Sequence, residues 1–404
     1  MSKGTLRNLS SSWQIFISTG EVSGDLQGAL LIDALYRKAN AVGVKLEIVA
    51  LGGPKMAAAG ATIIGDTSSI GSMGLLEALP HIWPTLQIQR RAQQYLRSHP
   101  PDVIVPIDYI GPNMNICTYV KQHLPQVPIV YYIAPQMWVW TPSDRDVKRM
   151  VNVIDKLLAI FPEEARYFQK QGAQVKWVGH PLLDRLQEFP KREQARASLG
   201  IAASEIAIAL LPCSRQQEVK YLLPVIFEAA KQLQEKLPQV HYWIPLSLEK
   251  LRLPLEKALA QYSLQATLVS EKTPEVLAAA DLALAKSGTV NLELALLNVP
   301  QVVVYRVHPF TWWIARNFFN FSIPFMSPPN LVQMQPVVPE FLQEQATAAN
   351  IVRSVLEILY NNKVRQQMLT DYQQVRQSLG ETGACERAAW EIIQIIAEKR
   401  NFKL

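Results

Sequence analysis

The sequence has little cysteine, and none in a pairing or metal-binding pattern. Its 404 residues contain three cysteines, Cys117, Cys213 and Cys385, which are odd in number and far apart. This excludes a disulfide framework and a CxxC redox or metal site, and it favours a reducing compartment. No cluster of His, Cys, Asp and Glu has metal-ligand spacing, so we expect neither a metal nor another cofactor.

Long apolar runs are also missing. No apolar run reaches the roughly 18 residues of a membrane-spanning helix, and the first residues lack the apolar stretch of a signal peptide. We therefore expect a cytoplasmic protein. The net charge of +6 favours an acidic partner such as anionic lipid or a nucleotide sugar. Lysine and arginine are scattered and form no basic stripe, which argues against nucleic acid.

Apolar content, in contrast, is high. The chain is 49% hydrophobic and too long for one compact core, which predicts two domains. Short β-branched runs alternate with helical patterns, as in parallel sheets covered on both faces. We therefore predict an α/β chain with two successive doubly wound, Rossmann-like sheets. The expected strands are Gln14–Ser18, Leu46–Leu51, Val103–Ile107, Ile129–Ile133, Lys156–Ile160 and Val175–Val178, then Ile206–Leu211, Tyr242–Leu246, Ala266–Val269, Leu282–Ala285 and Gln301–Tyr305.

A proline-containing, mixed-charge segment at 180–191 marks the expected joint between the domains. We expect an N-terminal domain over 1–185 and a C-terminal domain over 186–345. After Pro339 the pattern is purely helical, which predicts a helical tail over 346–404 that packs back on the first domain. Its expected helices are Ala346–Tyr360, Lys363–Leu379 and Ala384–Lys399.

Ligands of open α/β sheets bind at the carboxyl ends of the strands, so unusual residues there are informative. The first strand leads into STGEVSGDLQG (18–28), whose three glycines are four residues apart. Their spacing fits neither a dinucleotide nor a Walker motif. The segment is either a tight strand–helix turn, or it presents Glu21, Ser23 and Asp25 to sugar hydroxyls.

Two further strand ends in the first half carry polar or aromatic residues. Asp108 follows a buried strand and is either a structural partner or a base that takes a proton from a hydroxyl nucleophile. Trp138 and Trp140 flank the end of the next strand. They either pack in the core or stack on a sugar ring or acyl chain.

In the second half the strand ends suit a nucleotide. Arg215 stands where a helix begins, and a cation there opposes the helix dipole unless an anion lies between them. We therefore favour diphosphate binding over a surface arginine. Ser287-Gly288-Thr289 would form a small nest of donors for phosphate oxygens. Glu293, one turn later, is either a solvated helix residue or a ligand of two ribose hydroxyls.

Asn330 lies in a loop fixed by two prolines, and it is either a plain loop residue or a site amide. Taken together, the second half offers ligands for a diphosphate and a ribose, and the first half offers carboxylates and aromatic rings. This indicates transfer from a nucleotide-activated donor to a hydroxyl acceptor. Arginine and helix N-termini that neutralise the leaving diphosphate can replace a metal.

The ordered series of motifs resembles the lipid-A-disaccharide synthase family (glycosyltransferase family 19), and it spans about residues 15 to 345. The motifs are GEVSGDLQGA (20–29), GPKM (53–56), SMGLLE (72–77), ID (107–108), APQMWVW (134–140), FPEE (161–164), VGHPL (178–182), LPCSR (211–215), SGT (287–289), PNL (329–331) and VPEFL (338–342). Two departures stand out. Cys213 replaces a glycine of the family, and the loop 109–115 is two residues longer, with Asn113 in place of an acid.

The resemblance implies a GT-B glycosyltransferase that needs no metal. It implies transfer of 2,3-diacylglucosamine from UDP to 2,3-diacylglucosamine 1-phosphate (lipid X), with inversion, to form a β-1,6-linked disaccharide and UDP. By position, Asp108 would be the base or its close support, and Asn330 would belong to the essential site. Ser214 and Arg215 would bind UDP, and Met73 would lie on the acceptor side.

Acylated substrates imply peripheral contact with the inner membrane, for which the aromatic stretch 308–326 is suited, unless it packs in the core. Three alternatives stay open: a UDP-sugar enzyme with another acceptor, a UDP-sugar 2-epimerase, and a non-catalytic descendant that binds nucleotide sugar or lipid. A homo-oligomer is also left open.

Overall fold

The computed structural model describes residues 12–20, 22–67, 75–141, 143–214, 216–309, 312–313, 317 and 323–404. The chain divides into two compact units. The first unit consists of Met1–Pro181 and Glu381–Leu404, and the second of Leu182–Gly380. The expected tail over 346–404 is thus shared, because its last helix belongs to the first unit and the rest to the second. None of the described helices has the length and apolarity that crossing a membrane requires.

The first unit contains parallel strands in the orders β3-β2-β1-β4 and β5-β6-β7. Isolated bridges from Ile104 to Ile129 and from Ile107 to Tyr132 link β4 to β5. The strands are β1 (Trp13–Ser18), β2 (Leu46–Gly52), β3 (Thr62–Asp66), β4 (Val103–Pro106), β5 (Val130–Tyr132), β6 (Lys156–Ala159) and β7 (Val175–Trp177). Buried apolar side chains dominate β1 and β4, as parallel strands covered on both faces require.

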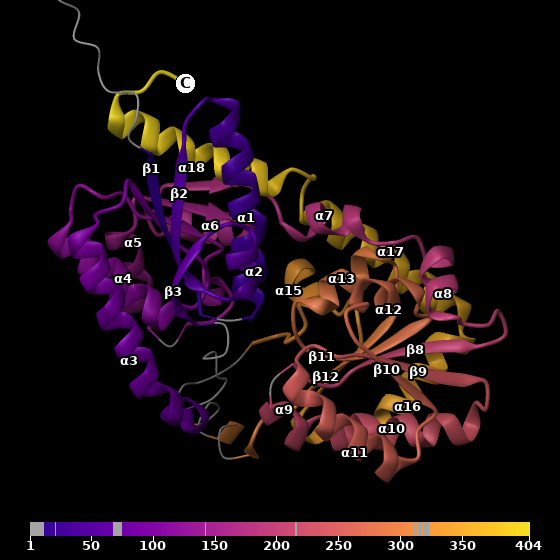
Figure 1. Cartoon of the computed structure of the whole chain (residues 1–404). Helices are drawn as coiled ribbons and strands as arrows, with labels where there is room; N and C mark the ends of the chain where they lie inside the picture. Colours follow the sequence, from indigo (N-terminus) through magenta and orange to yellow (C-terminus); the bar gives the residue numbers. More distant parts are fainter. Residues whose placement is uncertain are drawn as a thin grey trace, which may run out of the picture. The chain divides into compact units, whose positions relative to one another are not determined.

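Helices cover both faces of this sheet (Figure 1). Side chains of α3, α4 and α5 share one core cluster with Phe16, and α1 and α18 pack together on the opposite face. The helices are α1 (Val22–Ala41), α2 (Pro54–Ala58), α3 (Leu75–Ser98), α4 (Ile110–His123), α5 (Asp144–Val153), α6 (Pro162–Lys170) and α18 (Ala384–Arg400), with a short 3-10 turn η1 (Gln136–Trp138).

Polar contacts fasten α18 to the first unit. Arg400 donates from Nε and Nη2 to the two carboxylate oxygens of Asp102, both at 2.7 Å. Glu386 pairs with Arg37 at 2.7 Å and with Lys38 at 3.1 Å, both on α1. The last helix is therefore an integral part of a unit that begins some 370 residues earlier in the chain.

The second unit contains one parallel sheet in the order β10-β9-β8-β11-β12-β13. Its strands are β8 (Ile206–Leu211), β9 (Val240–Pro245), β10 (Ala266–Val269), β11 (Leu282–Lys286), β12 (Gln301–Tyr305) and β13 (Glu340–Leu342). β8 and β11 are neighbours, with Ala285 opposite Leu211, so the segments that follow these two strands start side by side.

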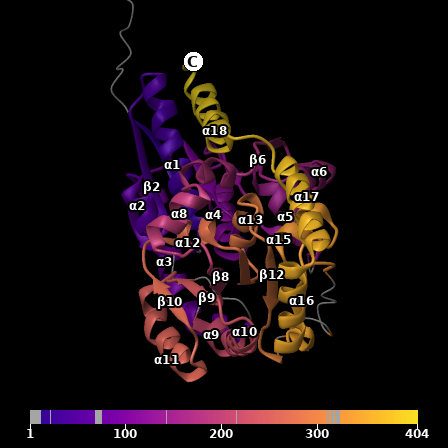
Figure 2. The same ribbon diagram turned by 90° about the vertical axis from the view of Figure 1, so that its right-hand side faces the viewer.

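Helices of the second unit also lie on both faces of its sheet, with α8, α12 and α13 on one face and α10, α11 and α16 on the other (Figures 1 and 2). The helices are α7 (Leu182–Arg185), α8 (Arg192–Leu199), α9 (Gln216–Tyr221), α10 (Leu223–Lys236), α11 (Arg252–Tyr262), α12 (Thr273–Ala279), α13 (Val290–Leu296), α15 (Pro328–Gln333), α16 (Ala348–Tyr360) and α17 (Asn362–Ser378). The parallel α/β prediction is confirmed.

Two short strands escaped the sequence prediction. β3 has five residues and only partly buried side chains, and β13 has three residues at the edge of its sheet. The prediction of purely helical structure after Pro339 is therefore wrong, since β13 pairs in parallel with β12. Such short edge strands lack the buried apolar run on which the prediction relied.

Candidate active site

The glycine-rich segment after β1 is a packing device. A Cβ at Gly20 would lie 1.8 Å from the Tyr109 ring, and one at Gly24 would lie 1.8 Å from Thr19 Oγ1. A Cβ at Gly28 would meet the Met56 sulfur at 2.6 Å. These clashes explain why glycines recur every fourth residue, since each leaves room for one neighbouring side chain.

Asp25 serves the fold within the same segment. Its buried carboxylate accepts hydrogen bonds from the backbone N–H groups of Gly53 (2.8 Å), Lys55 (3.0 Å) and Met56 (3.1 Å), at the start of α2. We therefore correct the sugar-binding interpretation of Asp25, because both of its oxygens cap α2. Ser23 is half-buried near the start of α1. Glu21 lies outside the described residues.

Asp108 stands at the carboxyl end of β4 with its backbone in the left-handed region, at φ 48°. Its N–H donates to the carbonyl oxygen of Ile133 at 3.0 Å. Its own carbonyl accepts from Tyr131 Oη at 2.5 Å and from Asn113 Nδ2 at 2.8 Å. Aspartate enters the left-handed region more readily than most non-glycine residues, and here three hydrogen bonds hold it there. The hydrogen bonds thus fix the backbone that carries the half-buried Asp108 carboxylate.

Asn113 organises this strand end, and the sequence analysis gave it no role. It is 0% exposed, and its Nδ2 donates to the carbonyls of both Ile107 (3.1 Å) and Asp108 (2.8 Å). Its Oδ1 accepts from Ser18 Oγ at 2.7 Å. A carboxylate at this position could not donate to two carbonyls. The amide that departs from the family's pattern therefore suits the longer loop in which it lies.

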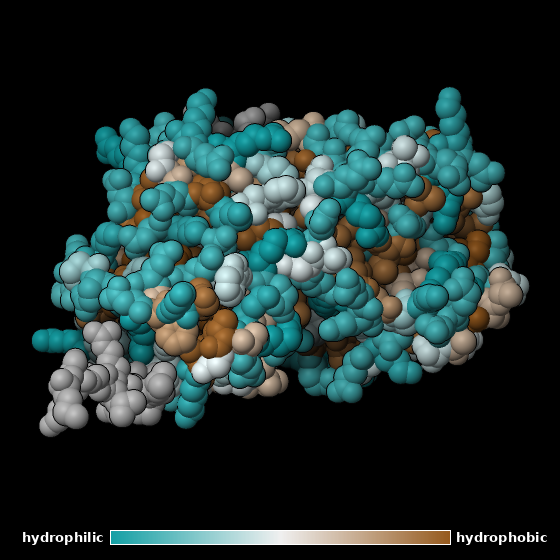
Figure 3. Space-filling view, turned by 90° about the horizontal axis from the view of Figure 1, so that it is seen from above, coloured by the Kyte–Doolittle hydropathy of each residue, from teal (hydrophilic) through white to brown (hydrophobic). Residues whose placement is uncertain are grey.

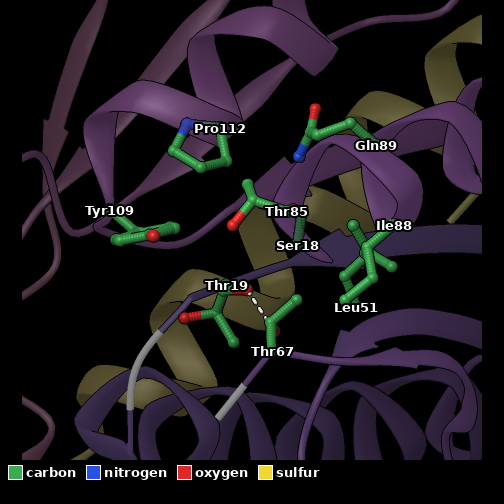
Figure 4. Close-up of a pocket in the computed structure, with 9 residues that line it drawn as sticks. All are labelled: Ser18, Thr19, Leu51, Thr67, Thr85, Ile88, Gln89, Tyr109 and Pro112. Atoms are coloured by element: carbon green, nitrogen blue, oxygen red, sulfur yellow. Dashed lines mark hydrogen bonds between the residues drawn. The ribbon is translucent and has the colours of Figure 1, made fainter. Parts of the chain in front are cut away.

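A small cavity opens beside Tyr109, at the carboxyl ends of β1 and β2 (Figure 4). Its empty space, including open solvent at the mouth, is about 260 Å³. Tyr109 and Pro112 form one side, and Thr67 and Thr19 lie across from them. The complete lining is Ser18, Thr19, Leu51, Thr67, Thr85, Ile88, Gln89, Tyr109 and Pro112. Its accessible lining is mainly apolar and it has room for about one water-sized group, so it can take at most a single small group of a ligand.

Glu164 ties two neighbouring strand ends together. It is 1% exposed and accepts from the N–H groups of Ala134 (2.8 Å), Ile160 (2.9 Å) and Phe161 (3.1 Å). The pKa of Glu164 is raised to about 7, chiefly by burial and in a smaller part by the nearby Asp108 charge. The three N–H donors oppose this rise, because they stabilise the ionised carboxylate. Trp138 lies in η1 with its ring 5.7 Å from that of Phe161. Glu164 thus holds the loop that presents Trp138.

The segments after β8 and β11 in the second unit hold the residues expected to bind UDP. Glu218 accepts from the N–H of Ser214 at 2.6 Å and pairs with Lys286 at 3.0 Å. Cys213 does not need a glycine's freedom, since it is absent from the described residues with positive φ. Burial raises the pKa of its thiol to about 12, so it stays protonated. Arg215 lies outside the described residues, and so does Met73 of the first unit.

Two hydrogen-bond donors of the Ser287-Gly288-Thr289 segment already have acceptors within the protein. The Ser287 hydroxyl donates to the Met326 carbonyl at 2.6 Å, and the Gly288 N–H donates to Asn291 Oδ1 at 2.7 Å. Thr289 precedes the first residue of α13. The expected nest of free donors is therefore only partly available in this conformation.

Glu293 is buried in α13 and pairs with Arg185. Burial raises the pKa of Glu293, and the guanidinium of Arg185 opposes that rise. The interpretation of Glu293 as a solvated helix residue is therefore wrong. A buried carboxylate neutralised by one arginine retains acceptor capacity for hydroxyl groups, since ionised carboxylates offer about four lone-pair sites.

Asn330 is 0% exposed and acts as a clamp. Its Nδ2 donates to the Val338 carbonyl at 3.0 Å and to Glu340 Oε2 at 3.2 Å, and its Oδ1 accepts from the Val338 N–H at 2.8 Å. Glu340 also accepts from the N–H groups of Met326 and Ser327. Because Met326 in turn accepts from Ser287, these contacts link Asn330 to the loop 287–289, and its place in the catalytic set stays a prediction.

The residues missed from the sequence are Asn113, Glu164, Glu340 and Lys286. Each adjoins or lies within a segment that the sequence analysis had singled out, so nearness to a motif was the available signal. Across the described parts of the chain, no group of three or more His, Cys, Asp or Glu side chains could hold a metal ion.

Comparison with known proteins identifies the family. The sequence model of the family described as lipid-A-disaccharide synthetase matches residues 15–395. A lipid-A-disaccharide synthase of Gloeothece citriformis is 58% identical, over 95% of this chain and 100% of the relative. Another, from a Synechocystis strain, is 53% identical over 94% of this chain and 97% of the relative.

The fold is shared more widely. The crystal structure of a putative UDP-N-acetylglucosamine 2-epimerase from Listeria monocytogenes aligns with a TM-score of 0.65 at 13% identity, covering 97% of this chain and 98% of that one. At that identity the likeness concerns the fold alone, which is the GT-B fold expected from the motifs. The family model and the near full-length relatives identify the family: this chain belongs to the lipid-A-disaccharide synthetase family of glycosyltransferases.

Proposed function

We propose that this glycosyltransferase moves 2,3-diacylglucosamine from UDP to the 6-hydroxyl of 2,3-diacylglucosamine 1-phosphate (lipid X). The products are UDP and the β-1,6-linked lipid A disaccharide 1-phosphate, with inversion at the sugar C1. The single observation that carries this proposal is the presentation of Asp108, whose strained backbone is fixed by hydrogen bonds at the carboxyl end of β4.

Asp108 is the proposed general base. It takes the proton of the acceptor hydroxyl while that oxygen attacks C1 and the bond from C1 to the UDP oxygen breaks. A carboxylate held on a rigid backbone reacts in a defined direction, which favours an aligned attack. Asn113 and Tyr131 position Asp108 through its carbonyl, and they do not touch the substrate themselves.

The acceptor lies on the first unit in this proposal. The cavity beside Tyr109 has room for about one water-sized group, so it would take a single hydroxyl or methylene of the acceptor, with the rest of the acceptor outside it. Trp138 would pack against the sugar, and Ser23 would bind a hydroxyl. Glu21 and Met73 remain acceptor-side predictions from the sequence.

The second unit would hold the donor. Ser214, Arg215 and the loop 287–289 would surround the leaving diphosphate, and the buried Glu293 would accept hydrogen bonds from the ribose hydroxyls. Charged and N–H donors aimed at the departing oxygen stabilise the charge that develops there, without a metal ion. Substitution of Arg215 by Ala is accordingly expected to abolish most turnover.

We also propose peripheral contact with the inner membrane. Three apolar side chains near the start of α3 are exposed: Trp83 (64%), Ile82 (49%) and Leu86 (43%). Trp313, within the stretch expected to meet the membrane, is 52% exposed. The face drawn in Figure 3, by comparison, is mainly hydrophilic, with hydrophobic side chains in smaller groups. Exposed Trp and aliphatic side chains of this kind enter the interfacial region of a bilayer.

One assay tests the reaction and its alternatives. Purified protein is incubated with UDP-diacylglucosamine and lipid X in the presence of a chelator, and the products are analysed by mass spectrometry. UDP together with a disaccharide 1-phosphate is expected. Intact UDP binding with no product would favour a binding protein, and product from another acceptor would favour a related transferase.

A 2-epimerase is the second candidate, because solved epimerases share the fold over nearly the whole chain. An epimerase needs no lipid acceptor and inverts the sugar at C2. Incubation with UDP-N-acetylglucosamine alone, followed by NMR of the sugar, would detect this activity. We expect no change in the sugar.

A further inference from the structure

A half-buried ion pair lies where two strand ends of the second unit meet. Lys286 is the last residue of β11, and Glu218 lies in the first turn of α9, just after β8. Lys286 Nζ is 3.0 Å from Glu218 Oε1, and the side chains are only 13% and 12% exposed. The pair therefore joins the two segments that carry Ser214 and Ser287.

The same carboxylate has a second partner on the β8 side. Glu218 Oε2 accepts from the Ser214 N–H at 2.6 Å and lies 3.4 Å from its hydroxyl oxygen. One carboxylate thus binds both an ammonium group and a backbone N–H. These two donors are also what phosphate oxygens bind, since both present hydrogens to an anion.

The loop after β11 has fewer donors available for an anion than its motif suggests. The Ser287 hydroxyl and the Gly288 N–H are engaged with Met326 and Asn291. Gly288 nevertheless keeps the lysine approachable, because a Cβ there would lie 3.3 Å from Lys286 Nζ. Lys286 is therefore the charged donor that this loop can offer to a phosphate.

We propose that Lys286 binds the diphosphate of the donor and that Glu218 occupies the same two donors when the nucleotide is absent. Nucleotide and carboxylate then compete for Lys286 and Ser214. Binding exchanges one anion for another without a covalent step, and the return of Glu218 assists the release of UDP. This inference rests on the proposed function, in which the second unit holds the UDP-sugar.

The geometry also separates this role from a simple helix cap. A glutamate near the start of a helix caps free N–H groups, and glutamine does so equally well. Glu218→Gln therefore keeps the cap and removes the charge that competes with phosphate. Lys286→Met removes the ammonium at similar length. Lys236→Met is the matched control, because Lys236 is exposed in the last turn of α10, just before the amino end of β9 and so at the opposite edge of the sheet.

The experiment is calorimetric titration of each protein with UDP and, separately, with uridine. Lys286→Met is expected to weaken UDP binding on the order of tenfold or more, since a charge-assisted contact is lost. Its uridine affinity stays within about twofold of wild type, because uridine carries no phosphate. Glu218→Gln is expected to tighten UDP binding by roughly threefold as the competing charge disappears. Lys236→Met changes neither affinity.

The outcomes distinguish the two proposals. A wild type that binds UDP no more tightly than uridine overturns both the donor assignment and the role of Lys286. A wild type that prefers UDP, beside a Lys286→Met variant with the same preference, overturns only the role of Lys286. Weaker UDP binding by Glu218→Gln overturns the competition.

Because Lys286→Met removes the ammonium group that faces the Glu218 carboxylate, that variant can lose stability for an unrelated reason. The neutral double variant Lys286→Met/Glu218→Gln removes this problem, and its thermal unfolding is measured beside the titration. Loss of the UDP preference in a double variant that stays folded supports the proposal. UDP binding as tight as in Glu218→Gln alone overturns it.

Discussion

The two units solve the same problem, holding a strand-end loop in place, with different parts. In the first unit a buried amide, Asn113, fastens a strained backbone so that one carboxylate, Asp108, is presented. In the second unit another buried amide, Asn330, fastens a loop through Glu340, and the charged pair Lys286–Glu218 remains near the strand ends. The comparison teaches that a buried motif amide can act through the loop that it fastens. What lies at the strand ends differs: the first unit presents a carboxylate and the second an ion pair, which our proposals assign to proton transfer and to phosphate binding.

Replacing Asp108 should have the largest effect on turnover. If turnover hardly changed, the assignment of the base to the first unit would fail. Asp108→Asn keeps the size but cannot take up the acceptor proton, so we expect kcat to fall on the order of 10²- to 10⁴-fold. UDP affinity, measured by calorimetry, should stay near wild type because the proposed UDP ligands lie in the second unit. A variant that retains a third or more of wild-type turnover would exclude Asp108 as the base.

The two buried amides sharpen the comparison, because each should affect a different step. Asn113→Asp replaces two donated hydrogen bonds with a buried charge facing carbonyls, and we expect turnover to fall about 100-fold with UDP affinity retained. Asn330→Asp loosens the loop around Ser287, and we expect UDP affinity to fall about tenfold. Steady-state kinetics and UDP titration of both variants would show the contrast. The same loss pattern in both would mean that the amides only support overall stability.

Two buried titratable groups of the first unit should give opposite pH dependences. Burial raises the pKa of Glu164 to about 7, so the folded state binds its proton more tightly than the unfolded chain. Its contribution to stability is therefore present at low pH and is lost as pH rises through about 4.5 to 7. Burial lowers the pKa of His180 to about 3, so its contribution is present above about 6.5 and is lost as pH falls.

Denaturant unfolding between pH 4.5 and 7 checks these signs. Relative to wild type, Glu164→Gln should become more stable with rising pH, by about 1 kcal/mol per pH unit. His180→Gln should show the opposite slope below about pH 6.5. Parallel curves for the two variants would contradict the assignment of either group.

The smallest effect is expected at Asp25, and it concerns stability alone. Asp25→Asn weakens the cap on α2, which should lower the free energy of unfolding by about 1–2 kcal/mol. Turnover per folded molecule and acceptor KM should not change. Ser23→Ala is the control from the same segment. For this variant we expect a raised acceptor KM and an unchanged free energy of unfolding. A raised KM for lipid X in Asp25→Asn, with stability intact, would restore the sugar-binding interpretation.

Much of the architecture was predictable because it depends on local pattern. Buried β-branched runs identified β1, β4, β8 and β12, since parallel strands must be apolar on both faces. The edge strands β3 and β13 were not predictable on that basis, because their side chains are only partly buried. Their pairing partners decide their structure, and partners are not visible in a short window of sequence.

The site was predictable in position more than in role. The motifs end at the strand ends as expected, and Asp108 stands where a base was expected. The role of Asp25 depends on hydrogen bonds to Gly53 and Met56, about 30 residues later in the chain. That of Asn330 depends on hydrogen bonds to Val338, where the chain folds back on α15. Neither residue type nor spacing distinguishes an acid that binds sugar from one that caps a helix.

The return of α18 has a consequence for the order in which this protein is synthesised. The last helix carries Glu386 and Arg400, which bond to Arg37, Lys38 and Asp102 near the other end of the chain. On the ribosome the second unit therefore has all of its residues before the first unit does. The face of α1 that α18 covers stays uncovered until residues 384–400 have been synthesised, so loss of α18 would damage the unit whose other residues were translated first.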